Sequence, residues 1–156
     1  MELEAIEREE QALALSRFDA DDAWWLGCHL RDRGAAAHAP IAIEIRRADT
    51  RLFSAILPGG TQNNLGWIAR KIAMVMRFEC SSYAMRLKFD AAPPGAFDRF
   101  GLDLGTYIAA GGAVPIRIAG TGVIGAVAIS GLSQEEDHRY AIEALAALKA
   151  HQESQA

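Results

Sequence analysis

The sequence predicts an α/β (α+β) fold, in which helices pack against an antiparallel sheet of four to five strands. Two stretches, residues 41–57 and 114–129, each have the pattern of a β-hairpin. A helical insertion separates them, and helical patterns also begin and end the chain. Because a short hairpin joins antiparallel strands, and because the apolar stripe of each helix needs a surface to cover, the expected result is a sheet flanked by helices.

Composition limits the class of protein. The 156 residues suit one domain, residues 1–156, which would bury roughly 68–70% of its extended-chain surface. The formal net charge of −4 argues against a general nucleic-acid binder, which needs a basic surface. The two cysteines, Cys28 and Cys80, have no metal-type spacing, so no metal site is expected. The first residues carry no basic signal region, and the longest apolar run is too short to span a bilayer. We therefore expect a cytoplasmic protein without a membrane partner.

Two helices are expected before the first strand. Residues 1–16 place apolar side chains among glutamates and predict an amphipathic helix with a solvated acidic face. A second helix runs from the aspartates at 19–22 to Gly34, which is a plausible C-terminal cap. Trp24 and Trp25 lie on this helix, either as a stacking platform for a planar ligand or packed against the sheet or another subunit.

The first hairpin combines a strand over residues 41–46, with strict alternation, and a strand over residues 52–57. The insertion that follows it contains three expected segments: a long helix over residues 65–78 capped by residues 61–64, a short helix over residues 81–87, and an irregular or briefly helical connector over residues 91–105.

The second hairpin and the last helix carry the clearest signals. Residues 114–119 alternate as a half-buried strand, and a Gly-Thr-Gly turn leads into residues 123–129, which are apolar on both faces and predict a central strand. Gly125 within that strand indicates close approach by another backbone or a helix. Ser133 and Glu136 have the spacing of a capping box at the start of the last helix.

Three sequence segments together resemble a known family. They are GTxxNxxWIxRKxxxVxxFxxSS over residues 60–82, GGxxPI over residues 111–116 and VxISGLxQEEDH over residues 127–138. This set is similar to the UPF0303 group, which is often described as haem-degrading domain-containing. The group belongs to the wider class that resembles GlcG, the haem-binding protein HbpS and the C-terminal domain of PduO-type proteins.

The resemblance implies a profilin-like three-layer α/β/α arrangement, homo-oligomers, and binding of haem or another small ligand near subunit boundaries. Two departures from the family pattern affect the expected chemistry. Asn63 stands where the family often has Asp, and Ala110 stands where it often has His directly before Gly-Gly. If that histidine is a haem or metal ligand in relatives, this chain lacks it.

His138, Asp137 and Glu135 are the candidates for catalysis. They follow a strand and begin a helix, where exposed amides favour anions and keep an imidazole neutral, so they could act as a ligand or acid–base cluster. The alternative is that the acids cap the helix and the histidine covers the core.

The candidates for ligand binding are motif residues that are polar, aromatic or glycine: Asn64, Trp67, Arg70, Lys71, Ser81, Ser82, Gly111, Gly112, Arg117 and His138. Arg70 and Lys71 could hold carboxylates or phosphates, but neighbouring helix residues point about 100° apart, so at most one should face a shared site. Ser81 and Ser82 could bind an anion or cap the next helix.

No Ser-His-Asp order, P-loop, Rossmann glycine fingerprint or zinc pattern occurs in the sequence. The expected function is therefore an oligomeric module that binds a small anionic or planar ligand, with haem as one candidate cofactor. Two alternatives stay open: a haem-handling or haem-degrading enzyme that uses His138 and the neighbouring acids, and a scaffold for other proteins.

Overall fold

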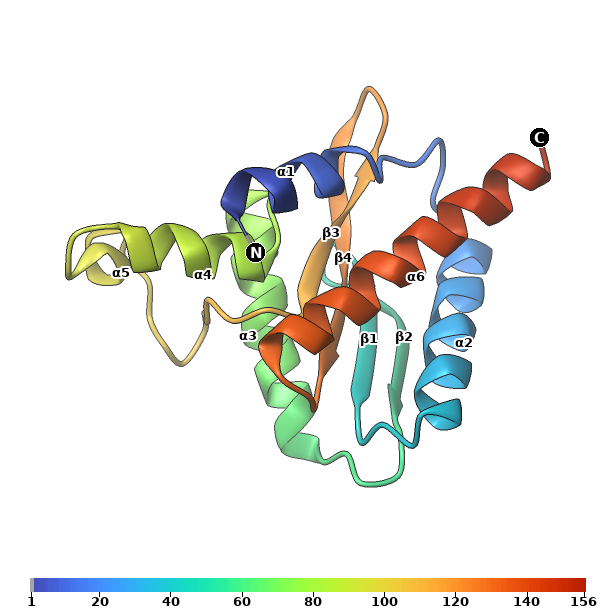
Figure 1. Ribbon diagram of the computed structural model, residues 1–156, viewed down its shortest axis with the longest axis horizontal. Helices are drawn as coiled ribbons and strands as arrows, with labels where there is room; N and C mark the ends of the chain where they lie inside the picture. Colours follow the sequence, from blue (N-terminus) through green and yellow to red (C-terminus); the bar gives the residue numbers. More distant parts are fainter. Residues whose placement is uncertain (1) are drawn as a thin grey trace.

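The sheet is antiparallel throughout. The computed structural model describes residues 2–156, so of the expected helix over residues 1–16 only Met1 lies outside the description. In that range four strands pair in the order β2-β1-β4-β3 (Figure 1). The strands are β1 Ala42–Arg47, β2 Thr50–Ile56, β3 Ala113–Ile118 and β4 Gly122–Ser130. Each predicted hairpin is present, and β1 pairs with β4 to join the two hairpins into one sheet.

Helices cover both faces of this sheet. They are α1 Leu3–Gln11, α2 Ala20–Ala36, α3 Gln62–Phe78, α4 Ser82–Ala91, α5 Ala96–Arg99 and α6 Gln134–Ser154. Helices α2 and α6 lie on one face and α3 lies on the other, while α1 and α4 lie beside the β3 edge (Figure 1). The predicted three-layer α/β/α arrangement is confirmed. No helix of the described chain is long and apolar enough to cross a membrane.

The two faces of the sheet carry side chains of different size. Ile43, Val127 and Ile129 point toward α2 and α6 and form the larger core with their leucines. The opposite face presents small residues such as Ala126 and Ala128 to α3. Because alanine occupies little space, the α3 backbone can approach the sheet closely, and long side chains of α3 can reach the strand backbone. This close approach positions the candidate site.

The N-terminal predictions need two corrections. The first helix ends at Gln11, because Leu15 forms an isolated bridge with Ile118 at the free edge of β3 instead of continuing the helix. Gly34 is not a C-terminal cap, since α2 continues to Ala36. A Cβ atom at Gly34 would lie 2.8 Å from the Leu57 side chain, so glycine is needed there for close packing.

The signals in the second hairpin and the last helix correspond to observed contacts. A Cβ atom at Gly125 would lie 2.0 Å from the Arg46 carbonyl oxygen, which is the predicted close backbone approach. The Glu136 amide donates to the Ser133 hydroxyl at 3.2 Å, so Ser133 caps α6. The second hydrogen bond of the expected capping box differs: the Glu136 carboxylate accepts from the Ser133 hydroxyl and not from the Ser133 amide.

Candidate functional site

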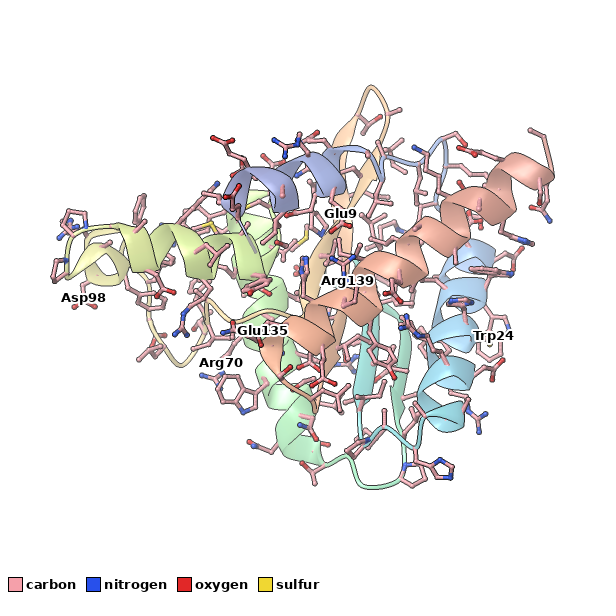
Figure 2. The ribbon with its side chains drawn as sticks, in the orientation of Figure 1. Glu9, Trp24, Arg70, Asp98, Glu135 and Arg139 are labelled. Atoms are coloured by element: carbon pink, nitrogen blue, oxygen red, sulfur yellow. The ribbon has the colours of Figure 1, made fainter. Side chains whose placement is uncertain are left out.

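A pocket of about 580 Å³ lies where the end of β4 meets the first turn of α6 and the middle of α3. Its lining combines charged, amide, aromatic and aliphatic groups: Asn64, Trp67, Lys71, Arg86, Ile108, Ala110, Ser130, Gly131, Leu132, Gln134, Glu135 and Asp137. Figure 2 shows Glu135 at the first turn of α6 and Arg70 on the adjoining part of α3. Residues from four elements and two loops therefore contribute to a single concave surface, which we call the Lys71 pocket.

A buried ion pair forms one wall of the Lys71 pocket. The Nζ atom of Lys71 lies 3.3 Å from Asp137 Oδ2 and 3.1 Å from the Ile129 carbonyl oxygen. The side chains of Lys71 and Asp137 are only 4% and 3% exposed. The second carboxylate oxygen of Asp137 accepts from the Leu132 amide at 3.0 Å. The α3 helix is thus fixed to the end of β4 and to α6 through one lysine.

Burial acts on both members of this pair. It lowers the pKa of the Lys71 ammonium and raises the pKa of the Asp137 carboxyl, and in each case the partner charge opposes the shift. Desolvation is the larger cause of the pKa shift in both groups. The free-energy difference between the ion pair and the neutral pair of amine and acid is therefore smaller than it would be in water.

Two glycines make room for this pair. A Cβ atom on Gly112 would lie 2.4 Å from the Ile129 carbonyl oxygen and 2.6 Å from Lys71 Nζ, and its φ of 140° is rarely adopted by other residues. A Cβ atom on Gly111 would lie 2.4 Å from the Gln134 carbonyl oxygen, while the Gly111 amide donates to Gln134 Oε1 at 3.1 Å. Neither glycine lines the pocket, so the Gly-Gly motif contributes the close packing that its absent side chains allow.

The mouth of the pocket lies beside the start of α3. The Thr61 amide donates to Asn64 Oδ1 at 2.9 Å, and Asn64 Nδ2 lies 3.5 Å from Ser130 Oγ. Trp67 lines the pocket, and the Arg70 guanidinium lies 4.5 Å from the centre of its indole ring. Arg70 itself faces a neighbouring hollow and donates to the Leu104 carbonyl. Of the adjacent cations, Lys71 lines the pocket and Arg70 does not.

His138 lies on the other side of α6. The residue is fully buried, and its ring packs edge-on against Tyr83 at a centroid distance of 5.1 Å. The next residue, Arg139, forms a two-bonded ion pair with Glu9 that connects α6 to α1 (Figure 2). Within residues 2–156 neither ring nitrogen has a hydrogen-bond partner, and burial lowers the imidazole pKa to about 4. His138 is neutral at pH 7 and does not line the pocket.

Three other sequence candidates also lie away from the Lys71 pocket. Ser81 caps α4, and its amide and hydroxyl both donate to the buried carboxylate of Glu10. The Ser82 hydroxyl accepts from the Ala113 amide at 3.1 Å, so it connects α4 to β3. Arg117 lines a separate pocket of about 810 Å³ beneath α1. Ser81 and Ser82 thus connect α4 to α1 and to β3, whereas Arg117 donates to the Glu79 carbonyl at the end of α3.

Some lining residues were not among the sequence candidates. Ser130, Leu132 and Gln134 belong to the motif that joins β4 to α6, so their position after a central strand was a usable signal. Arg86 comes from α4 and forms an ion pair with Asp90 at 3.1 Å. Nothing in its local sequence indicates that α4 would reach the Lys71 pocket.

The donor groups of the pocket do not suit haem iron. Among residues 2–156, its lining contains no histidine, cysteine, methionine or tyrosine, the side chains that act as axial haem ligands. Ala110 is the lining residue at the position where the family often has histidine. Nor does any cluster of three His, Cys, Asp or Glu side chains suited to a metal occur in the described part of the chain. The pocket instead presents nitrogen and oxygen groups that suit an organic acid.

Comparisons with known proteins give a consistent result. The sequence profile described as "Haem degrading protein HbpS-like" matches residues 18–146. A UPF0303 protein from Streptomyces coelicolor is 44% identical over 140 residues, covering 90% of this chain and 89% of that protein. The crystal structure of the Ybr137w protein is similar at 32% identity, with a TM-score of 0.88 over 97% of this chain and 90% of that one. A PduOC:heme complex is similar in fold, with a TM-score of 0.67 and 21% identity over 83% and 94% of the two chains.

Proposed function

This chain belongs to the HbpS-like family of haem-degrading proteins, and from that premise we propose that its Lys71 pocket binds a small, planar, anionic ligand. The observation that carries the proposal is the buried ammonium of Lys71. An ammonium group has three N–H donors. In residues 2–156 the Ile129 carbonyl and the Asp137 carboxylate accept from it, and the group also lines the pocket. A ligand acceptor can take the remaining proton.

The rest of the lining supports the same ligand class. Arg86 adds a second cation at the pocket wall, and its planar guanidinium is suited to two parallel hydrogen bonds with a carboxylate. Asn64 and Gln134 supply amide donors. The indole of Trp67 offers an apolar face on which a planar group can stack. The ligand class that uses all three features is a small planar carboxylate.

The family is described as haem degrading, and the PduOC chain of similar fold was crystallised as a heme complex. In this chain the pocket lacks an axial donor, so the proposal involves no iron chemistry. Catalysis by His138 is also outside the proposal, because the ring is fully buried against Tyr83 and does not line the pocket. Glu135 and Asp137 do line it, so the two acids stay available to orient a ligand.

A fluorescence titration with benzoate tests the proposal. Benzoate combines a carboxylate with a planar ring, so its binding should quench the fluorescence of Trp67. Trp24 and Trp25 do not line the pocket, so replacing Trp67 with Phe should abolish the quenching. Arg86→Gln, which changes a partly exposed side chain, should weaken benzoate binding by about tenfold, the cost of one charge-assisted hydrogen bond. Lys149→Met is the matched control, because Lys149 donates to the Ala12 carbonyl far from the pocket. Equal affinities in all variants would refute the assigned pocket.

We also propose that the chain forms homo-oligomers. In the described residues 2–156, four large hydrophobic side chains are exposed: Trp24 at 64%, Ile56 at 42%, Phe100 at 52% and Leu104 at 60%. Ile56 lies on the edge strand β2, whose outer side has no partner strand among residues 2–156. Light scattering after size exclusion should show a species larger than one chain, and Ile56→Lys should reduce it if β2 forms the contact. A monomer at all concentrations would refute self-association.

A further inference from the structure

The geometry of the Lys71–Asp137 pair points to a covalent function for the pocket: we propose that Lys71 captures the carbonyl group of a small 2-oxo acid as an imine. The inference rests on the proposed function, since it requires the ligand to enter the Lys71 pocket. It goes beyond that function by naming the reacting atom, the reacting group of the ligand and the class of substrate.

The first requirement for imine formation is an amine that faces the ligand. Lys71 lines the pocket, and its Nζ atom is held in place by the Ile129 carbonyl oxygen at 3.1 Å. Glycine at position 112 lets Nζ pack directly against the backbone, since a Cβ there would lie 2.6 Å from it. An amine in a dry, fixed position is the usual arrangement of lysines that form imines with carbonyl substrates.

The second requirement is a group that accepts and returns protons. Asp137 Oδ2 lies 3.3 Å from Lys71 Nζ, within reach of direct proton transfer along the hydrogen bond. Burial shifts the pKa of Lys71 downward and the pKa of Asp137 upward, which reduces the free-energy cost of moving one proton from the ammonium to the carboxylate. The transfer leaves a neutral amine beside a neutral acid without changing the net charge of the pocket.

The reaction then balances with these two residues alone. The Nζ lone pair forms a bond to the carbonyl carbon, and the carbonyl oxygen takes the proton of Asp137 to give a carbinolamine. The Asp137 carboxylate next removes one proton from the nitrogen and delivers it to the hydroxyl group, whose C–O bond breaks to release water. The product is an iminium ion on Lys71 beside the Asp137 carboxylate, so the pair of opposite charges is restored.

The third requirement is recognition of the carboxylate that distinguishes a 2-oxo acid from a simple aldehyde. Arg86 and Asn64 line the pocket with Lys71 and present a guanidinium and an amide. A 2-oxo acid places its carboxylate on the carbon next to the carbonyl, so a molecule joined to Lys71 would present that carboxylate to donors of the same pocket. A carbonyl compound without a carboxylate can react with Lys71 but lacks a group for Arg86 and Asn64 to bind.

The chain is well suited to a direct chemical test, because it contains only three lysines, Lys71, Lys88 and Lys149. The full-length protein is incubated with pyruvate and sodium cyanoborohydride, which reduces an iminium to a stable carboxyethyl amine. Peptide mapping then locates the adduct. We expect Lys71 to be modified at least about tenfold faster than either surface lysine, as for a buried amine with a lowered pKa. Acetone, which lacks a carboxylate, should give little adduct at Lys71.

Variants separate a specific adduct from a general one. The double variant Lys88→Arg/Lys149→Arg keeps Lys71 as the single lysine and should label as the wild type does. Adding Lys71→Arg keeps the positive charge beside Asp137 but removes the nucleophile, so the adduct within the pocket should disappear. Circular dichroism confirms that each variant is folded, and the wild-type peptide map gives the result even if Lys71→Arg unfolds.

The outcomes distinguish this inference from the function on which it rests. Preferential labelling of Lys71 that benzoate suppresses supports both. Benzoate binding together with pyruvate labelling no faster at Lys71 than at Lys88 or Lys149 overturns imine formation and leaves ligand binding intact. Absence of both benzoate binding and preferential labelling overturns the two together.

Discussion

The Nζ atom of Lys71 lies 2.6 Å from the point that a methyl group on Gly112 would occupy. The same methyl group would lie 2.4 Å from the Ile129 carbonyl oxygen, and the Gly112 φ of 140° is unfavourable for alanine. We therefore predict that Gly112→Ala lowers the free energy of unfolding by about 2–5 kcal/mol, from backbone strain and overpacking. Urea unfolding measures the change, and benzoate binding should weaken because Lys71 is displaced.

Gly66→Ala is the matched control for this substitution. Gly66 lies within α3, and a Cβ atom there would meet nothing within 4 Å. Alanine should raise the free energy of unfolding by roughly 0.5–1 kcal/mol, because glycine is the weaker helix former. If Gly112→Ala proves as harmless as Gly66→Ala, the close contact between Lys71 and Gly112 is absent in solution.

The buried pair of Lys71 and Asp137 should behave as one unit in a double-mutant cycle. Lys71→Met leaves a buried carboxylate without its cation, and Asp137→Asn leaves a buried ammonium without its anion. Each single change should cost about 3–5 kcal/mol of unfolding free energy. The double variant should cost at least about 1 kcal/mol less than the two single losses combined, since it leaves no unpaired charge. Additive losses would mean that the two side chains do not interact.

Much of the fold follows from local sequence patterns. The two hairpins, the central position of residues 123–129 and the cap at Ser133 each depend on residues that are near one another in the sequence, so the sequence predicts them well. The errors at Gly34 and at residues 12–16 have a common cause. Both segments pack against distant parts of the chain, Leu57 in one case and Ile118 in the other, and tertiary contacts override the local signal.

The candidate site was harder to predict for the same reason. Lys71 and Asp137 were both among the candidates, but their pairing depends on the alanine face that lets α3 approach the sheet. Asp137 and His138 are neighbours in sequence, yet a helix turns about 100° per residue. Asp137 therefore lines the pocket, whereas His138 packs against Tyr83. The burial of His138 agrees with the alternative that the histidine covers the core, whereas the pocket on the Asp137 side depends on residues distant in the sequence.

His138 should make stability depend on pH. Its folded-state pKa is lowered to about 4 by burial, against an ordinary value of 6.5. Between these values the unfolded chain binds a proton that the folded chain excludes, so the free energy of unfolding should fall as the pH decreases from 6.5 to 4. The total contribution is about 3 kcal/mol, and it stops growing below pH 4, where both states are protonated. Urea unfolding at several pH values measures it.

His138→Phe should remove this pH dependence. Phenylalanine can keep the edge-on contact with Tyr83 while it eliminates both unpartnered ring nitrogens. His38→Asn is the control, because His38 is exposed and has a positive φ that asparagine tolerates. If His138→Phe retains the full loss of stability between pH 6.5 and 4, the imidazole is solvated or hydrogen-bonded in solution, and other groups cause the effect.

A substitution at Ala110 tests whether the missing axial ligand is what prevents the pocket from binding haem. Ala110 lines the Lys71 pocket and stands where related sequences often carry histidine. Because the pocket contains no other axial donor, hemin added to the wild-type protein should not produce the Soret band of an imidazole-ligated iron. Ala110→His places an imidazole at the wall of the pocket and should create that band at micromolar hemin.

The control for this substitution is Ala36→His, which adds an exposed imidazole at the end of α2, away from the pocket. A band in Ala110→His that Ala36→His lacks would show that the pocket can admit the porphyrin and that only the ligand is missing. The same band in the wild type would locate a haem ligand elsewhere in the chain. No band in Ala110→His would mean that Trp67, Arg86 and Ile108 close the pocket to a porphyrin, which leaves it to smaller planar acids.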